Sequence, residues 1–288
     1  MQVLNIGSLN IDIVYRVPHI VQPGETLSSY SVSKHAGGKG LNQSIALARA
    51  GVEVAHAGAI GRDGMFLKEL LEKEKVDCSE IAVLENEPTG CAVIQVADDG
   101  ENSIILLHGA NFEITPDMIG NALRKMPEKS IVLLQNEISS LKECIEIAAG
   151  MNMRIFFNSS PMDKTISDLP LELIDTFLVN ENESSELKKS AGKRIVGCNI
   201  LTTFGTAGAE YRGCDGEFIR VPAAKASNAV DTTGAGDTFT GFFIASMVQG
   251  KAPEEALKTA AAAAAVSVTR HGAAESIPYQ HELKDLLS

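Results

Sequence analysis

Short apolar runs alternate with segments of helical spacing along most of the chain. Val3–Ile6, Val54–Ile60 and Ile131–Leu134 have the length and apolar character of buried strands. Gly40–Ala50 and Met65–Lys75 instead place their apolar residues as one face of a helix does. Strands that alternate with helices are typical of βαβ units, so this pattern predicts a parallel sheet.

The same pattern extends toward the C-terminus. Further strands are expected at Ile155–Phe157, Thr176–Val179 and Ile200–Thr203. Further helices are expected at Leu141–Ala149, Ala235–Val248, Pro253–Thr269 and Tyr279–Leu287. The alanine run at 260–265 fits a closely packed helix face, because alanine is the best helix former.

Two regions interrupt this rhythm. Residues 12–34 hold alternating segments separated by prolines and a glycine, and residues 89–107 are predicted to form a hairpin with its turn at 98–100. These β segments predict one small sheet that is inserted into the main domain and covers it. We therefore expect a single domain over 1–288, a three-layer α/β/α fold with a mostly parallel central sheet and a small β lid.

Composition narrows the class of protein. The 288 residues carry 25 Lys and Arg against 37 Asp and Glu, a net charge of -12, which argues against a broad nucleic-acid or anionic-membrane surface. No apolar stretch is long enough to cross a membrane, and the first residues enter a strand pattern without signal-peptide features. The five cysteines are scattered, as are the six histidines, so no disulfide framework or zinc site is indicated. A cytoplasmic protein is expected.

The clearest candidate for chemistry is the run DTTGAGDTF at residues 231–239, a glycine-rich turn that leads into a helix. The first amides of a helix lack internal partners and lie at the positive end of its dipole, so Gly234, Ala235 and Gly236 can receive a phosphate or a developing oxyanion. A carboxylate there would oppose phosphate binding unless it has another task, and Asp237 could accept the proton of an incoming hydroxyl. The alternative is that Asp237 only complements the helix dipole.

A second glycine-rich run, GGKGLNQ at residues 37–43, precedes the first helix. It is not a Walker A loop, because Ser33 replaces the first glycine and Leu41 the Ser or Thr. The glycines would let a ligand approach backbone amides, with Lys39 and Asn42 as further donors. A flexible turn before a helix is the competing interpretation.

Three weaker signals follow strands. Asn10 and Asp12 would share one face of a strand and could hold vicinal hydroxyls of a sugar, although Asn-x-Asp is also common in turns. Asn180 and Glu183 would share a helix start and could hold hydrated Mg²⁺ and phosphate oxygens, although the same spacing fits an N-cap. The small-residue loop at 203–208 could lie along a nucleotide or be an ordinary turn.

Taken in this order, these runs resemble the ribokinase-like carbohydrate kinase family. The resemblance extends from GSLNID at 7–12 to TRHGA at 269–273, and its two signature regions are 37–43 and 231–241. It implies an α/β domain with a β lid over the sugar, and transfer of the γ-phosphate of ATP to a sugar hydroxyl. Within the family, the run at 37–43 favours D-ribose, phosphorylated at its primary hydroxyl. The resemblance also suggests a homodimer joined through the lids, in which an exposed β edge of one copy would pair with the other copy.

The resemblance also assigns site residues by position. Asp237 is the implied catalytic base, with the amides of Gly234, Ala235 and Gly236 as the anion hole. The implied sugar-binding residues are Asn10, Asp12, Gly38, Lys39, Gly40, Asn42, Glu137 and Asp237. The implied nucleotide-binding residues are Asn180, Thr203, Phe204, Gly205, Thr206, Ala207, Gly208 and Gly236.

Two cations are implied in the same way. Glu183 corresponds to the acid associated with Mg²⁺ through water. A monovalent cation, usually K⁺, is bound next to the anion hole in such proteins, in part through backbone carbonyls. The implied K⁺ positions are Asp231, Thr233, Ser267, Arg270, Gly272 and Ser276.

Three features depart from the family pattern, and they bear on nucleotide preference more than on the sugar. NSSP at 158–161 replaces a more apolar Asn-Pro segment, the stretch 180–200 is shorter than usual, and Ala261 lies where an imidazole or amide near adenine is often found. Separately, kinases for a fructose-type sugar, deoxyribose or adenosine are alternatives, although the run at 37–43 favours ribose over fructose-type relatives. A non-catalytic sugar or nucleotide sensor is a further alternative, although a sensor has no need of the base Asp237.

Overall fold

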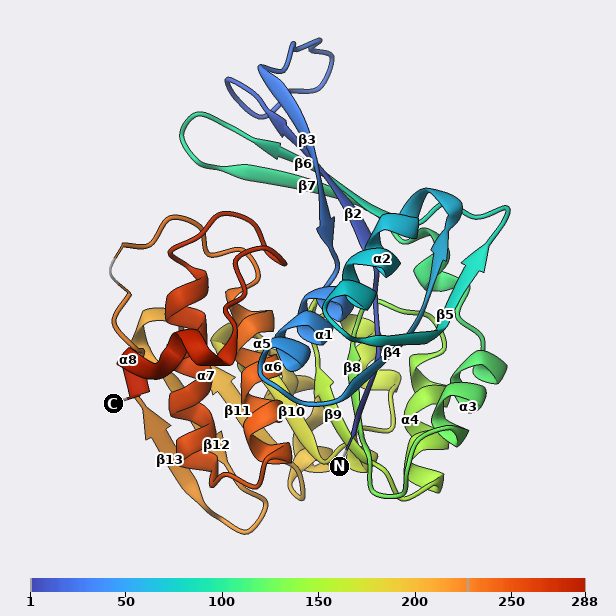
Figure 1. The fold of residues 1–288 in the computed structure, drawn as a ribbon, viewed down its shortest axis with the longest axis vertical. Helices are drawn as coiled ribbons and strands as arrows, with labels where there is room; N and C mark the ends of the chain where they lie inside the picture. The colour runs from blue at the N-terminus through green and yellow to red at the C-terminus, as the bar shows by residue number, and fades with distance from the viewer. Residues whose placement is uncertain (1, 227, 288) are drawn as a thin grey trace.

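The computed structural model of the protein describes residues 2–226 and 228–287 and is built on a nine-stranded sheet (Figure 1). The strands lie in the order β13-β12-β11-β10-β9-β8-β1-β4-β5. Their bounds are β1 Val3–Ile6, β4 Val54–Gly61, β5 Asp77–Leu84, β8 Ile131–Gln135, β9 Arg154–Asn158, β10 Thr176–Asn180, β11 Asn199–Thr203, β12 Ala209–Arg212 and β13 Phe218–Val221. Neighbouring strands from β11 to β5 run parallel, and only the pairs made by β12 are antiparallel.

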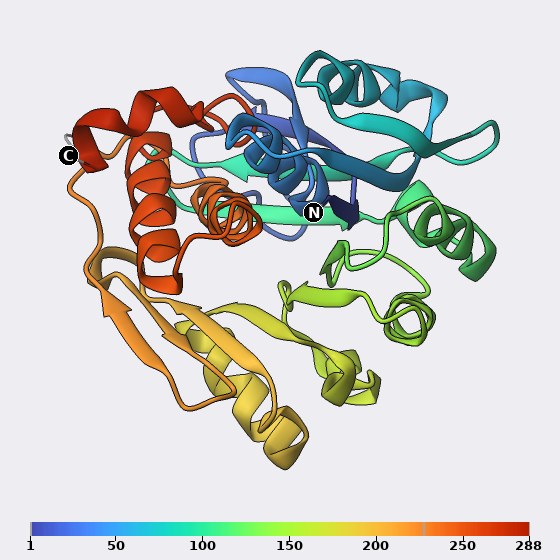
Figure 2. The same cartoon turned by 60° about the horizontal axis from the view of Figure 1, so that its bottom comes forward.

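Helices cover both faces of this sheet (Figure 2). Their bounds are α1 Lys39–Arg49, α2 Met65–Lys73, α3 Pro116–Arg124, α4 Leu141–Gly150, α5 Glu181–Ala191, α6 Ala235–Val248, α7 Pro253–Ser267 and α8 Lys284–Leu287. Alternate strand residues divide between the faces: Val3 and Leu133 pack in the core with α1, α2, α6 and α7, whereas Leu4 and Leu134 pack with α3, α4 and α5. The expected three-layer α/β/α class is therefore confirmed. No helix within the described residues is long and apolar enough to span a bilayer.

A second, four-stranded sheet stands out from one end of the body (Figure 1). Its strands are β2 Asn10–Arg16, β3 Ser31–Gly37, β6 Gly90–Val96 and β7 Asn102–Leu107, in the order β3-β2-β6-β7. Both stretches that interrupted the sequence pattern contribute to it. Within residues 12–34, the second strand begins only at Ser31, because β2 ends at Arg16 and Arg16 pairs with Ser31.

Several elements escaped the sequence pattern. Strand β5 lies at the edge of the sheet and carries polar residues, and β12 and β13 are short strands of a hairpin. The expected C-terminal helix is in fact a 3₁₀ turn at Gln280–Leu283 followed by α8. That turn is tight because the Glu282 amide donates to the Tyr279 carbonyl, three residues back.

The strand order places a crevice at the middle of the main sheet. Strand β1 is paired with β4 on one side and with β8 on the other. After β1 the sheet is built outward through β4 and β5 on one side, and then through β8 to β13 on the other. Ligands of open α/β sheets bind outside the carboxyl ends of the strands at such a point. Ser8 follows β1 and Glu137 follows β8, so both lie at this crevice.

Candidate active site

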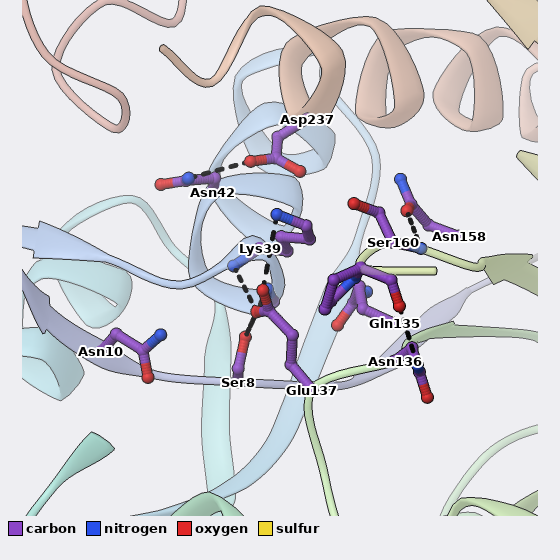
Figure 3. Close-up of polar contacts among 12 residues, drawn as sticks. Ser8, Asn10, Lys39, Asn42, Gln135, Asn136, Glu137, Asn158, Ser160 and Asp237 are labelled. Carbon is purple, nitrogen blue, oxygen red and sulfur yellow. Dashed lines mark hydrogen bonds and ion pairs between the residues drawn. The ribbon is translucent and has the colours of Figure 1, made fainter. Parts of the chain in front are cut away.

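A cluster of charged and polar groups occupies the crevice between β1, β8 and the start of α1 (Figure 3). Ser8 Oγ donates to Glu137 Oε2 at 2.5 Å, and the Lys39 amide donates to the same oxygen at 3.2 Å. The Lys39 ammonium lies 3.4 Å from Glu137 Oε1. Burial lowers the pKa of Lys39, but the carboxylates of Glu137 and Asp237 outweigh it and raise that pKa overall. Lys39 is therefore a fixed cation between two acids.

The first residues of β2 lie beside this cluster. The buried Asn10 accepts a hydrogen bond at Oδ1 from Asn111 Nδ2 at 2.8 Å, which fixes the direction of its amide. Burial raises the pKa of Asp12 to about 7, and the neighbouring Glu137 adds to the rise while Lys39 opposes it. Burial and the neighbouring carboxylate thus favour the protonated form of Asp12.

Asp237 lies in the first turn of α6 and faces α1. Its Oδ2 accepts from Asn42 Nδ2 at 2.9 Å, and its Oδ1 accepts from Gln43 Nε2 at 2.8 Å. Burial raises its pKa and outweighs the lowering effects of Lys39 and the two amides. The carboxylate is held at both oxygens and lies in a cavity, so it does not point freely into solvent.

The turn before α6 presents backbone amides beside this carboxylate. Gly234 is the N-cap residue with φ +73°, a left-handed conformation that favours glycine. The amides of Gly234 and Gly236 donate to no backbone carbonyl among the described residues. The Ala235 amide, also expected in the anion hole, donates to the Thr232 carbonyl at 3.3 Å. Of the three amides expected in the anion hole, those of Gly234 and Gly236 are therefore the two without a partner among the described residues.

A polar cavity of about 190 Å³ lies between α6 and the strand ends. Its polar lining includes Lys39, Asn158, Asn180, Glu183 and Asp237. The cavity thus brings residues from α1, β9, β10, α5 and α6 together, although they are distant in sequence. The departure at residues 158–161 contributes here, because Ser160 also lines the cavity and its amide donates to Asn158 Oδ1 at 3.0 Å (Figure 3).

Asn180 and Glu183 form a complete capping box at the start of α5. Asn180 Oδ1 accepts from the Glu183 amide, and Glu183 Oε2 accepts from the Asn180 amide, both at 2.9 Å. The N-cap that the spacing of Asn180 and Glu183 predicted is therefore present. Both side chains also line the polar cavity, so capping fixes their positions without removing them from the site.

An apolar cavity of about 310 Å³ adjoins the polar cavity, and Thr203 and Gly236 line both. Most of its lining is small and apolar: Ala223, Ala224, Ala226, Ala229, Ala261, Ala264, Ala265, Phe239 and Val268. Gly205, Thr206 and Gly208 line it as well. Phe204 and Ala207 of the same loop do not, and the Phe204 ring instead lies 5.7 Å from the Arg220 guanidinium.

The implied K⁺ positions lie on two segments that meet behind the turn before α6. Asp231 joins them, because its Oδ1 accepts from the Thr233 amide and hydroxyl while its Oδ2 accepts from the Gly272 amide at 3.0 Å. The Ser267 and Ser276 hydroxyls donate to carbonyls of their own segments, and the Arg270 guanidinium donates to Glu282. These bonds orient the serine hydroxyls and the guanidinium, and Asp231 is the one residue of the six that offers a carboxylate.

Four residues of this region were missed by the sequence analysis: Ser8, Gln43, Asn111 and Gln135. Gln43 lies inside the second glycine-rich run and was quoted there, but its side chain was assigned no role. Gln135 is the last residue of the otherwise apolar strand β8. A polar residue at the end of an otherwise apolar parallel strand was the signal available for Gln135.

Comparison with known proteins gives the family. A sequence profile described as pfkB family carbohydrate kinase matches residues 2–280. The chain belongs to this family. The ribokinase of Haemophilus influenzae is 34% identical over 297 residues, covering 98% of this chain and 97% of that protein.

Two further relatives match over nearly the whole chain. The structure of Arabidopsis thaliana ribokinase complexed with ribose and ATP matches with a TM-score of 0.86 and 31% identity, covering 99% of this chain and 98% of that one. The deoxyribokinase of Salmonella typhi is 29% identical, covering 100% of this chain and 99% of that protein.

Proposed function

We propose that this carbohydrate kinase transfers the γ-phosphate of ATP to the primary hydroxyl of D-ribose and forms ribose 5-phosphate. The single observation that carries the proposal is the placement of Asp237: both its oxygens are held by amides of α1, beside the free amides of Gly234 and Gly236. A base beside an oxyanion site is what transfer to an alcohol requires. The likeness to ribokinases supports the choice of sugar.

The crevice supplies the groups that would hold the sugar. Asn10, Asp12, Lys39, Asn42 and Glu137 offer amides, carboxylates and an ammonium, and Gly38 and Gly40 flank the lysine. Asn42 Oδ1 is buried and has no hydrogen-bond partner among the described residues, so a sugar hydroxyl would satisfy it. Several fixed donors and acceptors of this kind favour a polyol over an apolar alcohol.

The nucleotide would occupy the two adjoining cavities. We place the base and ribose of ATP in the apolar cavity, along the loop at 203–208, and the phosphates in the polar cavity near Asn180. The γ-phosphate would then approach the amides of Gly234 and Gly236. Asp237 would orient the primary hydroxyl and accept its proton as the oxygen–phosphorus bond forms, because phosphoryl transfer depends on positioning and charge neutralisation.

Both implied cations fit residues that are present. Glu183 has a carboxylate at the polar cavity, which suits Mg²⁺ held through water. Asp231 and the backbone carbonyls of the 267–276 segment suit K⁺, and Asp231 already joins that segment to the turn before α6. When bound, Mg²⁺ neutralises phosphate charge and K⁺ fixes the direction of the turn's amides.

The small sheet would act as a lid and as the contact between two copies of the chain. Strand β7 lies at its edge, and Ile104, Ile105 and Leu107 are 57%, 65% and 53% exposed. An apolar edge strand is a ready partner for a second sheet. Sedimentation should give a dimer for the unmodified chain and a monomer for Ile105→Lys; two equal masses would refute this contact.

The proposed reaction is tested by an assay that couples ADP release to a visible signal. The panel contains ribose, deoxyribose, fructose, fructose 6-phosphate and adenosine, each with and without K⁺. We expect ribose to give the largest kcat/KM and K⁺ to raise it. Fructose or adenosine as the only good substrate would overturn the ribose assignment and keep the kinase.

Deoxyribose is the second candidate substrate, favoured by the likeness to a deoxyribokinase. The two sugars differ by the 2-hydroxyl, which the carboxylates of Asp12 and Glu137 could bind. A site that binds a hydroxyl discriminates strongly against the analogue that lacks it. A ribose to deoxyribose ratio near one in kcat/KM would therefore favour a site that does not bind this hydroxyl.

A further inference from the structure

A row of hydrogen-bonded buried amides extends from Asp237 into the body of the protein. Of this row, the proposed reaction uses only Asp237 itself. Gln43 Nε2 donates to Asp237 Oδ1 at 2.8 Å. Gln135 Nε2 donates to Gln43 Oε1 at 2.8 Å and to Asn5 Oδ1 at 2.9 Å. Gln43, Gln135 and Asn5 are each fully buried. These side chains come from α1, β8 and β1, so the row links the helix to the sheet beneath it.

The row continues to a buried histidine. Asn5 Nδ2 donates to Ser44 Oγ at 2.8 Å, and Ser44 Oγ lies 2.8 Å from His56 Nδ1. His56 Nε2 lies 3.2 Å from the Gly7 carbonyl. His56 is fully buried, and burial lowers its pKa to about 4, partly opposed by the Gly7 carbonyl.

Hydrogen-bond chemistry allows one direction along this row. The Gly7 carbonyl can only accept, so His56 carries its proton on Nε2 and accepts at Nδ1. Ser44 then donates to His56 and accepts from Asn5. Asn5 must therefore turn its oxygen toward Gln135.

The same reasoning continues to the carboxylate. Because Asn5 presents its oxygen, Gln135 presents its NH₂ group to both Asn5 and Gln43. Gln43 accepts with its oxygen and is left with its NH₂ group facing Asp237. An ionised carboxylate can only accept, so both ends of the row agree on this direction. The neutral state of His56 is part of this agreement, because a proton on Nδ1 would compete with the Ser44 hydroxyl.

The close packing around Gln135 holds the row in place. A Cβ added to Gly7 would lie 2.1 Å from Gln135 Oε1, so a glycine is needed for this amide to fit. Gln135 Oε1 has no hydrogen-bond partner among the described residues. Leaving a buried amide oxygen unpartnered is unfavourable, which indicates that the orientation of Gln135 is set by its two donated bonds.

We propose that Gln43 is a positioning residue for the Asp237 carboxylate, and that Gln135, Asn5, Ser44 and His56 fix the direction of the Gln43 amide. This inference rests on the proposed function for its consequence in catalysis, because Asp237 is the base only if the chain is a kinase. Lys39, Glu137 and Glu183 are the charged groups that face this region from α1, the segment after β8 and α5, and none of them is hydrogen-bonded to Gln43 Nε2 among the described residues.

The decisive variant is Gln43→Met, which keeps the length of the side chain and removes both polar ends. The bond from Gln43 stabilises the ionised carboxylate, so its loss should raise the pKa of Asp237 by about one unit. A ¹³C NMR titration of aspartate carboxyls, with Asp237→Asn to assign the signal, measures this without substrate. In turnover, kcat should fall about 10- to 100-fold with the KM for ribose nearly unchanged, and the acidic limb of kcat should move to higher pH.

Two further variants keep the test sharp. Gln135→Met leaves Gln43 in place but frees its amide to rotate, so it should produce the same changes at smaller size, and it serves if Gln43→Met does not fold. Gln249→Met is the matched control, because Gln249 Nε2 donates to the Ala50 carbonyl at 3.0 Å, outside the row. It should behave as the unmodified protein.

An unchanged Asp237 pKa in both Gln43→Met and Gln135→Met would overturn the positioning role. A fall in kcat of the same size in the control Gln249→Met would overturn it too. The outcome is separate from that of the proposed function. If the unmodified chain phosphorylates no sugar, the kinase assignment fails, and the NMR titration still decides whether Gln43 sets the state of Asp237.

Discussion

The polar cavity and the apolar cavity adjoin at Gly236 and Thr203, yet their linings differ in kind. In and beside the polar cavity, Asp237, Lys39 and Glu137 are each held by named hydrogen bonds or ion pairs. The apolar cavity is lined mainly by alanine side chains, which can offer shape but no hydrogen bond.

This difference has a consequence for selectivity. Fixed polar groups reject a ligand that leaves them unpaired, whereas an apolar wall distinguishes ligands only weakly by size. We therefore expect the kinase to be strict toward its sugar and tolerant toward the base of its nucleotide. The first three predictions below each change a residue that lines one of the two cavities, and the fourth concerns Asp12, near Lys39.

The largest effect is expected for Asp237→Asn. The variant keeps the shape of the side chain but cannot accept the hydroxyl proton, so kcat should fall by about 10²- to 10⁴-fold. Ribose binding, measured by calorimetry, should change little. Turnover within tenfold of the unmodified protein would contradict the role of Asp237 as base.

A smaller effect is expected for Lys39→Met, which removes the cation between Glu137 and Asp237. The KM for ribose should rise about 10- to 100-fold, because a bond to a charged group is lost and Glu137 loses its ion-pair partner. The KM for ATP should rise much less. Equal increases in both values would show that Lys39 acts on the phosphates instead.

The apolar side is tested by Ala264→Leu on α7. The larger side chain would occupy part of the apolar cavity, so the KM for ATP should rise about tenfold while the KM for ribose stays constant. Lys258→Met, on an exposed part of the same helix, is the control. In the unmodified enzyme, the kcat/KM values for ATP and GTP should differ by less than about tenfold. A ratio of about 10³ would show that the cavity recognises the base by more than its shape.

The smallest effect concerns stability and pH. Because the folded-state pKa of Asp12 is raised from 3.8 to about 7, its contribution to the free energy of unfolding is present below pH 4 and is lost as pH rises through 7. Between pH 5 and 8 the free energy of unfolding of the unmodified protein should fall by about 1 kcal/mol more than that of Asp12→Asn, after allowance for the partial exposure of Asp12. Urea unfolding at several pH values measures this, with exposed Asp168→Asn as the control.

Much of the fold could be predicted because its elements have strong local signals. Helix α6 has the bounds that its pattern predicted, 235–248, since a glycine turn precedes a long apolar segment. The strands β5, β12 and β13, which lie at or next to the edges of the sheet, could not be predicted, because each is short or partly polar and has no clear period.

The site was predictable only in part, and for a physical reason. Residues at glycine turns, such as Lys39 and Asp237, are found because the turn itself is visible in the sequence. The partners Gln43 and Gln135 are separated by 92 positions, and their bond depends on how α1 is rotated against β8. That rotation is set by packing across the sheet, which no local pattern records.

The most direct test of the central claim is a crystal structure of the unmodified enzyme with ribose and a non-hydrolysable ATP analogue. The account predicts the primary hydroxyl of ribose within hydrogen-bond reach of the Asp237 carboxylate, about 2.6–3.2 Å, with the terminal phosphate next to the amides of Gly234 and Gly236. A ribose whose primary hydroxyl points away from Asp237, or a phosphate bound elsewhere, would contradict it.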